Sequence, residues 1–452
     1  MCRNICLLIT VLIAPLSGQE SADQQKLLQE VLRRLDNLEQ QNRELLEQVK
    51  ELKAQSQAER ARESAATNKA VEPPLEERIK VNEARIAEQA QTKVESTQKF
   101  PVWLYGTLLF NSFYNSDKDA GNALGSYGLL TGAASSGATL RQTILGLNFQ
   151  GPALPGGGHV DGELEMDFWA GPPGPSSNWL RIRRGGISFN WSDTNVYLGQ
   201  DKPLISPYEP NSLAEVGIPP LAGSGNLWFW LPQARVEHTV HFSPRNGTDA
   251  QVAVLQTGHY LDVATTSVPG ILAGGVRPAL EGRLAFWHKE GDNKKFEIAP
   301  GFHISRDHVI GNAVNSRIGS LDWLYNPVSK LNLKGAAYYG EDVASLGALG
   351  NGFYLTEYGS ARPVVSAGGW SQVSIPVDNR TTFDIFGGLE NDQASNIYAP
   401  GIARTSSFAG NVMFHLSPNV LLSLEAQRLW TRTFAGKPET YNHYDLALAY
   451  LF

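Results

Sequence analysis

The chain has few of the residues that disulfide-bonded or metal-dependent proteins require. Only 2 of its 452 residues are cysteines, Cys2 and Cys6, and both lie in the apolar segment at the amino terminus. The rest of the chain can therefore form neither disulfides nor thiolate metal sites. Beyond that segment, no apolar run is long enough to cross a membrane as a helix.

The sequence also lacks the patterns of the common enzymes and of nucleic-acid-binding proteins. Charged residues make up 18% of the chain, and the formal net charge is −7, which argues against a nucleic-acid partner. The 9 histidines are scattered. There is no His-Glu-x-x-His, Gly-x-Ser-x-Gly or phosphate loop. We therefore expect no catalysis, no cofactor and no metal site.

The amino terminus has the pattern of a secretory signal peptide over residues 1–18. Arg3 provides the positive start, Ile5–Ile13 the apolar core and Leu16-Ser17-Gly18 the small-residue exit. A buried core helix is the alternative.

A heptad pattern follows directly and predicts a self-associating coiled coil over residues 19–72. Its core positions are Leu28, Val31, Leu35, Leu38, Asn42, Leu45, Val49 and Leu52. The one polar member, Asn42, is typical of a residue that fixes register and oligomeric state. A lone amphipathic helix is the alternative. Residues 73–99, which begin at Pro73-Pro74, are predicted to be a linker with a second helical segment.

From Val102 onward the apolar period changes to two, which predicts amphipathic strands. In His159–Trp169, apolar residues alternate with Asp161, Glu163, Glu165 and Asp167, which in a barrel would face the pore. The predicted strands run near 102–113, 139–149, 159–169, 180–191, 195–200, 228–242, 249–257, 279–288, 295–306, 315–326, 331–341, 364–375, 380–390, 404–416, 420–432 and 441–452.

The links between these strands alternate between short turns and mostly longer loops, the shortest of which is expected before the last strand. This alternation is typical of transmembrane barrels. The prediction is an all-β transmembrane barrel of about 16 antiparallel strands over residues 100–452, preceded by the α-helical coiled coil. A soluble sandwich or propeller is the alternative. It does not explain the aromatic strand ends, which we expect at the periplasmic interface: Trp103, Tyr105, Trp191, Trp323 and Tyr325.

The longest loop, 201–227, is the candidate for a constriction. Its five prolines limit backbone freedom, so it could keep a fixed shape if it folds inward. It carries Asp201, Lys202 and Glu209 and leads into the aromatic cluster Trp228–Trp230. A long surface loop is the alternative.

Basic residues on strands complete the candidate site. Arg184, Arg235 and Arg283 lie opposite outward apolar neighbours and are expected in the lumen. Together with the acidic row 161–167 they would set ion preference, or they would simply neutralise one another. Arg181 and Arg183 have outward parity, which places them above the membrane or at a bulge.

Several short stretches resemble one known family. They are Leu180-Arg181-Ile182-Arg183-Arg184, Tyr197-Leu198-Gly199-Gln200, Pro232-Gln233-Ala234-Arg235, the segment 278–286 and the closing Ala449-Tyr450-Leu451-Phe452. Together with the coiled coil and the barrel, they look like the DcaP-like trimeric porins of Gram-negative bacteria. The final aromatic resembles the signal by which outer-membrane proteins are recognised for assembly.

The resemblance implies a homotrimer in the cell outer membrane, formed through coiled coil and barrel, with the coiled coil in the periplasm. It implies passive diffusion and ion transport of small hydrophilic solutes, anionic organic ones among them, and lumenal roles for Arg184, Arg235 and Arg283. Two other functions stay open. One is a sugar porin that uses the tryptophans at 228–230 as a stacking track. The other is a barrel-anchored tether whose coiled coil engages periplasmic partners.

Overall fold

The computed structural model describes residues 101–116, 123–125, 132–171, 178–257, 274–275, 277–291, 293–309, 312–348, 352–356, 358–393, 401–434 and 436–452. The predicted signal peptide, coiled coil and second helical segment lie outside the described residues and stay predictions. Within the described ranges, no helix has the length and apolar character needed to span a membrane.

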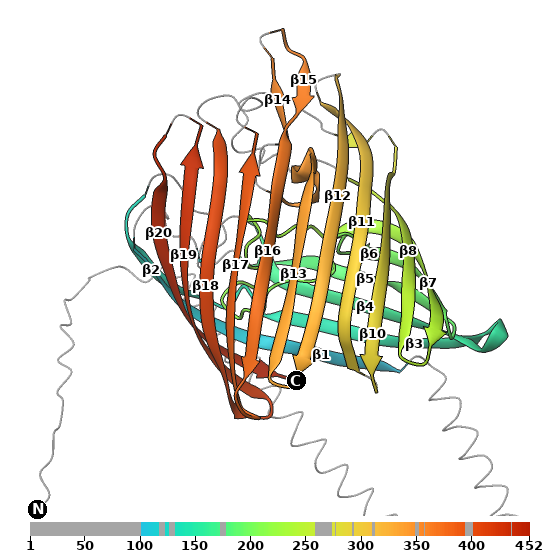
Figure 1. Ribbon diagram of the computed structural model, residues 1–452. Helices are drawn as coiled ribbons and strands as arrows, with labels where there is room; N and C mark the ends of the chain where they lie inside the picture. The colour runs from blue at the N-terminus through green and yellow to red at the C-terminus, as the bar shows by residue number, and fades with distance from the viewer. Residues whose placement is uncertain are drawn as a thin grey trace, which may run out of the picture. The chain divides into compact units, whose positions relative to one another are not determined.

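The described chain folds into a closed antiparallel barrel of 16 strands, which confirms the predicted barrel (Figure 1). In order around the barrel they are β1 (Val102–Asn115), β3 (Ile144–Leu154), β4 (Gly158–Ala170), β5 (Trp179–Asn190), β6 (Thr194–Asp201), β7 (Leu231–Ser243), β8 (Asn246–Leu255), β10 (Ala279–Glu290), β11 (Asn293–Val309), β12 (Asn312–Val328), β13 (Leu331–Glu341), β16 (Val365–Pro376), β17 (Thr381–Asp392), β18 (Ile402–Ser417), β19 (Val420–Thr433) and β20 (Glu439–Leu451).

Short additional elements decorate this barrel. β2 (Ser135–Thr139) pairs with β1, and β9 (Gly274–Gly275) pairs with β11. A separate hairpin of β14 (Phe353–Leu355) and β15 (Ala361–Pro363) stands above the wall (Figure 1). Two single-turn 3₁₀ helices, Pro155–Gly157 and Val343–Leu346, lie between strands.

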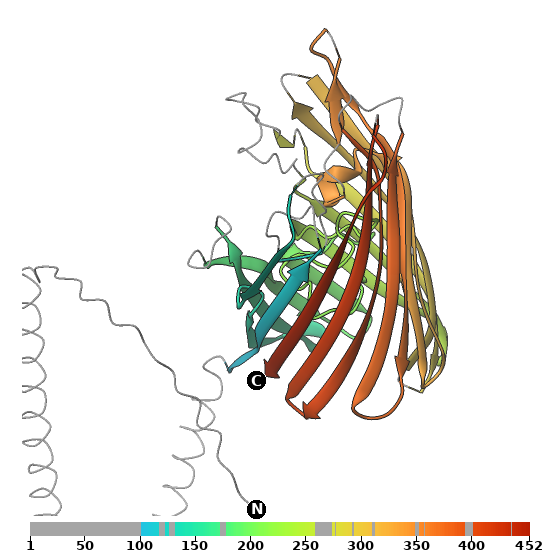
Figure 2. The ribbon, with the colours of Figure 1, turned by 90° about the vertical axis from the view of Figure 1, so that its left-hand side faces the viewer.

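The first and last strands close the barrel. β1 and β20 pair from Thr107 with Leu451 to Asn115 with His443. The amide of Gly106 donates to the carbonyl of Phe452 at 3.0 Å, and the return bond is 3.2 Å. Figure 2 shows the tilted strands of this wall from the side. Closure removes the two edges of the sheet. Unpaired amides and carbonyls at such edges would be unfavourable in the hydrocarbon core of a membrane.

Alternate side chains on each strand face opposite sides of the wall. On β20, Tyr444 and Tyr450 are nearly half exposed, whereas Asp445 and Ala447 between them are buried in the barrel. Apolar residues of neighbouring strands, such as Leu108 and Leu424, continue the outward belt. An outward apolar belt around a polar interior is what a barrel needs in order to sit in a lipid bilayer.

The two ends of the barrel differ. At one end, which we call the turn end, lie the carboxy terminus and short connections such as residues 191–193 between β5 and β6. The other, the loop end, carries the β14–β15 hairpin and longer connections (Figure 1). The expectation that the shortest of these precedes β20 is wrong. β11 extends to Val309 and β12 begins at Asn312, so only two residues join them.

The aromatic strand ends do not all face outward. Trp323 and Tyr325 share the outer face with the exposed Leu321, as expected. Tyr105, however, pairs with Gly146 in the row that continues through Glu165 to Arg184, so it lies on the inner face. A Cβ at Gly146 would lie 2.1 Å from its ring, so glycine there makes room for the tyrosine. The position of Tyr105 at a strand end predicted its place along the barrel axis, but not which face of the wall it occupies.

The closure predicts a specific disulfide. Leu108 and Tyr450 are register partners on the outer face of β1 and β20. The variant Leu108→Cys/Tyr450→Cys is expected to oxidise within one chain, since directly paired residues lie within disulfide range. Leu108→Cys/Leu446→Cys is the control, displaced by roughly 13 Å along the strand. Mobility on non-reducing gels measures the crosslink. Equal oxidation of both pairs would contradict the closure.

Candidate functional site

The segment between β6 and β7, residues 202–230, folds into the barrel; we call it the inner loop. Its backbone bonds to strands far apart around the wall. The amide of Leu204 donates to Glu281 on β10 at 2.6 Å, and that of Asn211 donates to Gln372 on β16 at 2.6 Å. Most of its residues are buried, and in Figure 1 it is the green coil between the walls. The loop therefore crosses the lumen and does not lie on the surface.

Gln142, which lies just before β3, anchors the far side of the inner loop. Its Oε1 accepts from the amides of Val216 and Gly217 at 2.6 and 2.8 Å, and its Nε2 donates to the carbonyl of Ala214 at 2.7 Å. One buried side chain thus satisfies three backbone groups of the loop. Without such partners, each buried backbone group would carry a desolvation cost.

The tip of the loop bonds to the wall formed by β17, β18 and β19. Asn211 donates to Asp384 at 3.2 Å, and Ser212 donates to Glu425 at 2.6 Å. Asn411 joins both sides, since it donates to the carbonyl of Asn211 at 2.9 Å and to Glu425 at 3.0 Å. Asp384 and Glu425 therefore hold the loop tip against this part of the barrel wall.

A close backbone approach fixes the last part of the loop. Gly225 has φ +102°, and a Cβ there would lie 2.4 and 2.5 Å from the carbonyl oxygens of Gly369 and Leu389. Only glycine fits this contact with β16 and β17. Nearby, Leu221 is fully buried against Trp370 although its φ of 62° is unfavourable for leucine. Packing against the wall holds this conformation.

A β-bulge turns three arginines towards the lumen. Glu165 pairs with Arg184, and the next residue of β4 pairs with Ile182, so Arg183 is the extra residue. Arg183 and Arg184 each lie 3.1 Å from Glu165. Arg181 bonds Asp167 at 2.5 Å. The outward parity assigned to Arg181 and Arg183 from sequence is therefore corrected, because a bulge reverses the alternation beyond it.

The predicted loop charges also form pairs. Asp201 ends β6 and lies 3.0 Å from Arg235, whose guanidinium stacks on Tyr197 with its carbon 4.5 Å from the ring centre. Lys202 bonds Glu209 within the loop. The first pair joins the end of β6 to β7, and the second joins two residues of the inner loop.

Lys334 on β13 differs from these basic residues. Its ammonium donates to Asn211 at 2.7 Å, and no carboxylate of the described residues lies within ion-pair distance. Sequence reasoning missed it, although it has the inward parity of the neighbouring Asn332.

These residues surround a cavity of about 720 Å³ between the inner loop and the wall. Its walls include five basic side chains and four acidic ones: Arg183, Arg184, Lys202, Arg235 and Lys334, and Glu165, Asp201, Glu209 and Glu215. Two of the cavity arginines, Arg184 and Arg235, are more accessible than the carboxylates they contact. The side chains of Arg184 and Arg235 are 36% and 24% exposed, against 10% for Glu165 and 13% for Asp201.

Other predicted site residues lie elsewhere on the inner wall. Asp161 contacts His159 at 3.0 Å near the turn end, and Asp167 is fully buried beneath the arginines. Glu163 is half-buried on the inner face between Asp161 and Glu165 but does not line the cavity. The acidic row thus faces inward, as the alternation predicted. Neighbouring arginines neutralise its last two members, Glu165 and Asp167.

Arg283 is enclosed in an ion cluster. Its guanidinium contacts Glu297 at 2.5 Å, Asp322 at 2.6 Å and Gln251 at 3.0 Å, and Tyr208 of the inner loop donates to Glu297 at 2.7 Å. Its side chain is 5% exposed. This arginine joins β10, β11 and β12 to the loop and presents little of its charge to the lumen.

The aromatic cluster at the end of the loop is covered. The guanidinium carbons of Arg183 and Arg181 lie 4.6 and 5.1 Å from the ring centre of Trp230. Trp228 is 8% exposed and packs edge-on against Phe229. Among the described residues, no group of three or more histidine, cysteine or acidic side chains could hold a metal ion.

The fold is similar to that of solved outer-membrane channels. The outer membrane channel DcaP of Acinetobacter baumannii has a TM-score of 0.65 at 18% identity, and the match covers 78% of this chain and 97% of that one. The chain has the fold of the outer-membrane porins. The predicted resemblance to the DcaP-like porins is thereby confirmed at the level of the fold.

Two further porins match over 78% of this chain. An anion-selective porin from Comamonas acidovorans has a TM-score of 0.54 at 15% identity over its whole length, and Salmonella typhi OmpF one of 0.51 at 11% identity over 97% of its length. No protein-family model and no curated protein matches the sequence.

The ion cluster predicts a structural effect of Arg283. Arg283→Met leaves the buried Asp322 without a cation and Glu297 with Lys294 alone, so we expect it to lower the free energy of unfolding by about 3 to 5 kcal/mol. Urea unfolding in lipid vesicles measures this. Arg380→Met, in the exposed turn before β17, is the control and is expected to change little. Unchanged stability of Arg283→Met, together with a changed ion preference, would assign Arg283 to the pore instead.

Proposed function

We propose that the chain is an outer-membrane porin for the passive diffusion of small hydrophilic solutes, anionic organic ones among them. The observation that carries this is the inner loop, which bonds to opposite walls and leaves a polar cavity in the lumen. A rigid loop inside a wide barrel narrows the passage without blocking it. Solutes that pass must be small and must tolerate a polar lining.

The charges of the cavity favour anions. Basic side chains are in slight excess. Arg184 and Arg235 present donors that their carboxylate partners do not fully use, and Lys334 bonds only the amide of Asn211. Rings and walls of such side chains set ion preference in pores. Two members of the acidic row on β4, Glu165 and Asp167, do not oppose this, because they already contact three arginines. Glu163 does not line the cavity.

The two other candidate functions have less support. A sugar porin needs exposed aromatic faces for stacking, but Trp228 is buried and guanidinium groups cover Trp230. A purely structural tether would not need the polar cavity that lies between the inner loop and the barrel wall. The heptads at 19–72 instead support the proposal of a homotrimer, held in the periplasm by the coiled coil and in the membrane by the barrels.

The proposal predicts the ion preference of a charge variant. Arg184→Gln/Arg235→Gln/Lys334→Gln should shift the anion-to-cation permeability ratio towards cations by about two-fold or more, because it removes positive charge beside the passage. Reversal potentials across planar bilayers in a salt gradient measure the ratio, and Arg380→Gln is the exposed control. Wild-type insertions should open in groups of three pores. A reversal potential that the triple variant leaves unchanged would rule out these residues as the filter.

A further inference from the structure

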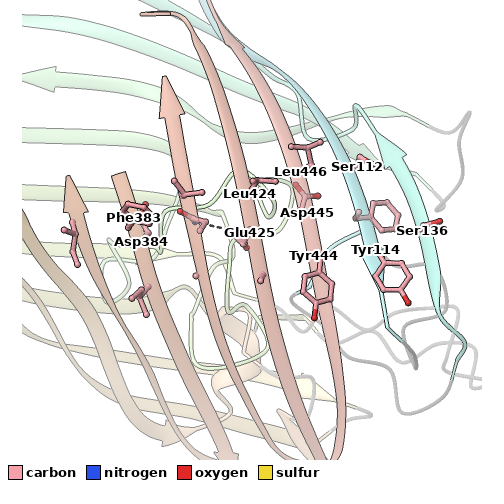
Figure 3. Close-up of a pocket in the computed structure, with 17 residues that line it drawn as sticks. Ser112, Tyr114, Ser136, Phe383, Asp384, Leu424, Glu425, Tyr444, Asp445 and Leu446 are labelled. Carbon is pink, nitrogen blue, oxygen red and sulfur yellow. Dashed lines mark hydrogen bonds between the residues drawn. The ribbon is translucent and has the colours of Figure 1, made fainter. Parts of the chain in front are cut away.

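An open hollow lies on the outer face of the barrel wall, across β1 and β17 to β20 (Figure 3). Its volume is about 1060 Å³. The side chains that edge it are mainly apolar, and they include Phe383, Ile385, Leu424 and Leu446. Gly410 and Ala426 form its floor, since their small side chains leave the wall thin between these large neighbours.

The carboxylates of the same wall point the other way. Asp384, Glu425 and Asp445 lie in these strands, but their side chains bond Asn211, Ser212 and Asn111 on the inner side. Tyr114 and Tyr444 stand together at one side of the hollow, with ring centres 6.3 Å apart. The outer face of the hollow is therefore apolar and suited to hydrocarbon.

Three arginines lie above the hollow, towards the loop end. Arg404 on β18 and Arg428 and Arg432 on β19 are exposed, while their strand neighbours Thr405 and Gln427 are buried, so the arginines face outward. Arg428 follows Ala426 by two positions on the same face, roughly 7 Å along the strand. Trp430 lies between the two β19 arginines, with the guanidinium of Arg428 5.4 Å from its ring centre.

Nothing in the described chain neutralises this cluster. Arg404 and Arg432 are direct cross-strand partners, an arrangement in which like charges repel. None of the three arginines lies within ion-pair distance of a carboxylate among the residues of known placement. An anionic group from outside the chain would remove the repulsion.

We propose that this outer face binds a phosphorylated glycolipid of the outer leaflet. The phosphates would contact Arg404, Arg428 and Arg432, and the acyl chains would fill the hollow. Most of the lining lies on five neighbouring strands, β17 to β20 and β1, with Ile375 of β16 and Ser136 of β2 at its edges. Five strands span roughly 20 Å at the usual strand spacing, which suits a lipid with several chains better than one with two. The choice of leaflet rests on the proposed function, which places the loop end outside the cell.

Native mass spectrometry of the full-length protein in detergent tests the headgroup contacts, with diphosphorylated lipid A as the added probe. The wild type should bind one saturable lipid per chain. Arg404→Gln/Arg428→Gln/Arg432→Gln should weaken binding roughly a hundred-fold, at about ten-fold or less per arginine. Arg306→Gln/Arg317→Gln removes two outward arginines of β11 and β12, strands that contribute no residue to the hollow. This control should bind like the wild type.

A second variant tests the hollow itself. A Cβ at Gly410 would meet only the carbonyl oxygen of Asp384, at 3.6 Å, so a side chain can extend outward there without strain. Gly410→Phe should fill the hollow and weaken lipid A binding about ten-fold or more. Its single-channel conductance should stay that of the wild type, which separates this proposal from the proposed channel function.

Four results would overturn the proposal. One is equal binding of phosphatidylethanolamine, which would show that the phosphate-rich headgroup is not recognised. Another is unchanged lipid A binding by the triple arginine variant. The third is crosslinking of Ala426→Cys between two copies without lipid A binding, which would make the hollow a contact between barrels. Tight binding of phosphatidylglycerol in place of lipid A would also reject the glycolipid.

Discussion

The inner loop must satisfy its own backbone groups inside the barrel, and much of the interior is arranged to meet that need. Gln142 binds three of these groups, and Asp384 and Glu425 hold side chains at the loop tip. A loop bonded on opposite sides cannot swing freely, so it divides the lumen in a fixed way. The size and charge of the remaining passage depend on these contacts.

Several inward carboxylates do not line the passage because they bind the inner loop or a buried arginine instead. Glu425 serves the loop, and Glu297 and Asp322 enclose Arg283. Buried charges are tolerated only when paired. What is left beside the cavity is a small excess of basic side chains, five against four acidic ones, and the proposed preference for anions rests on them although the chain has a net charge of −7.

The barrel could be predicted from sequence because alternation of polar and apolar residues is local, and all 16 predicted strands overlap strands of the structure. The bulge at Arg183 was one of two alternatives for its outward parity, and the sequence could not decide between them because the bulge depends on how β5 pairs with β4. The neutralisation of Arg283 by Asp322 was also hidden, since the two residues are 39 positions apart and meet across β11. For Lys334, the sequence predicts that the side chain faces inward. Its contact with Asn211 could not be predicted, because it depends on where the inner loop lies.

The most direct test of this account asks whether the inner loop borders the conducting path. The chain has no cysteine beyond Cys6, so Glu209→Cys places a single thiol on the loop, and Tyr358→Cys places one on the exposed outer hairpin as a control. Single-channel current is recorded before and after a bulky thiol reagent is added. The account predicts a stepwise fall in current for Glu209→Cys and none for Tyr358→Cys. An unchanged current after complete labelling of Glu209→Cys would contradict it.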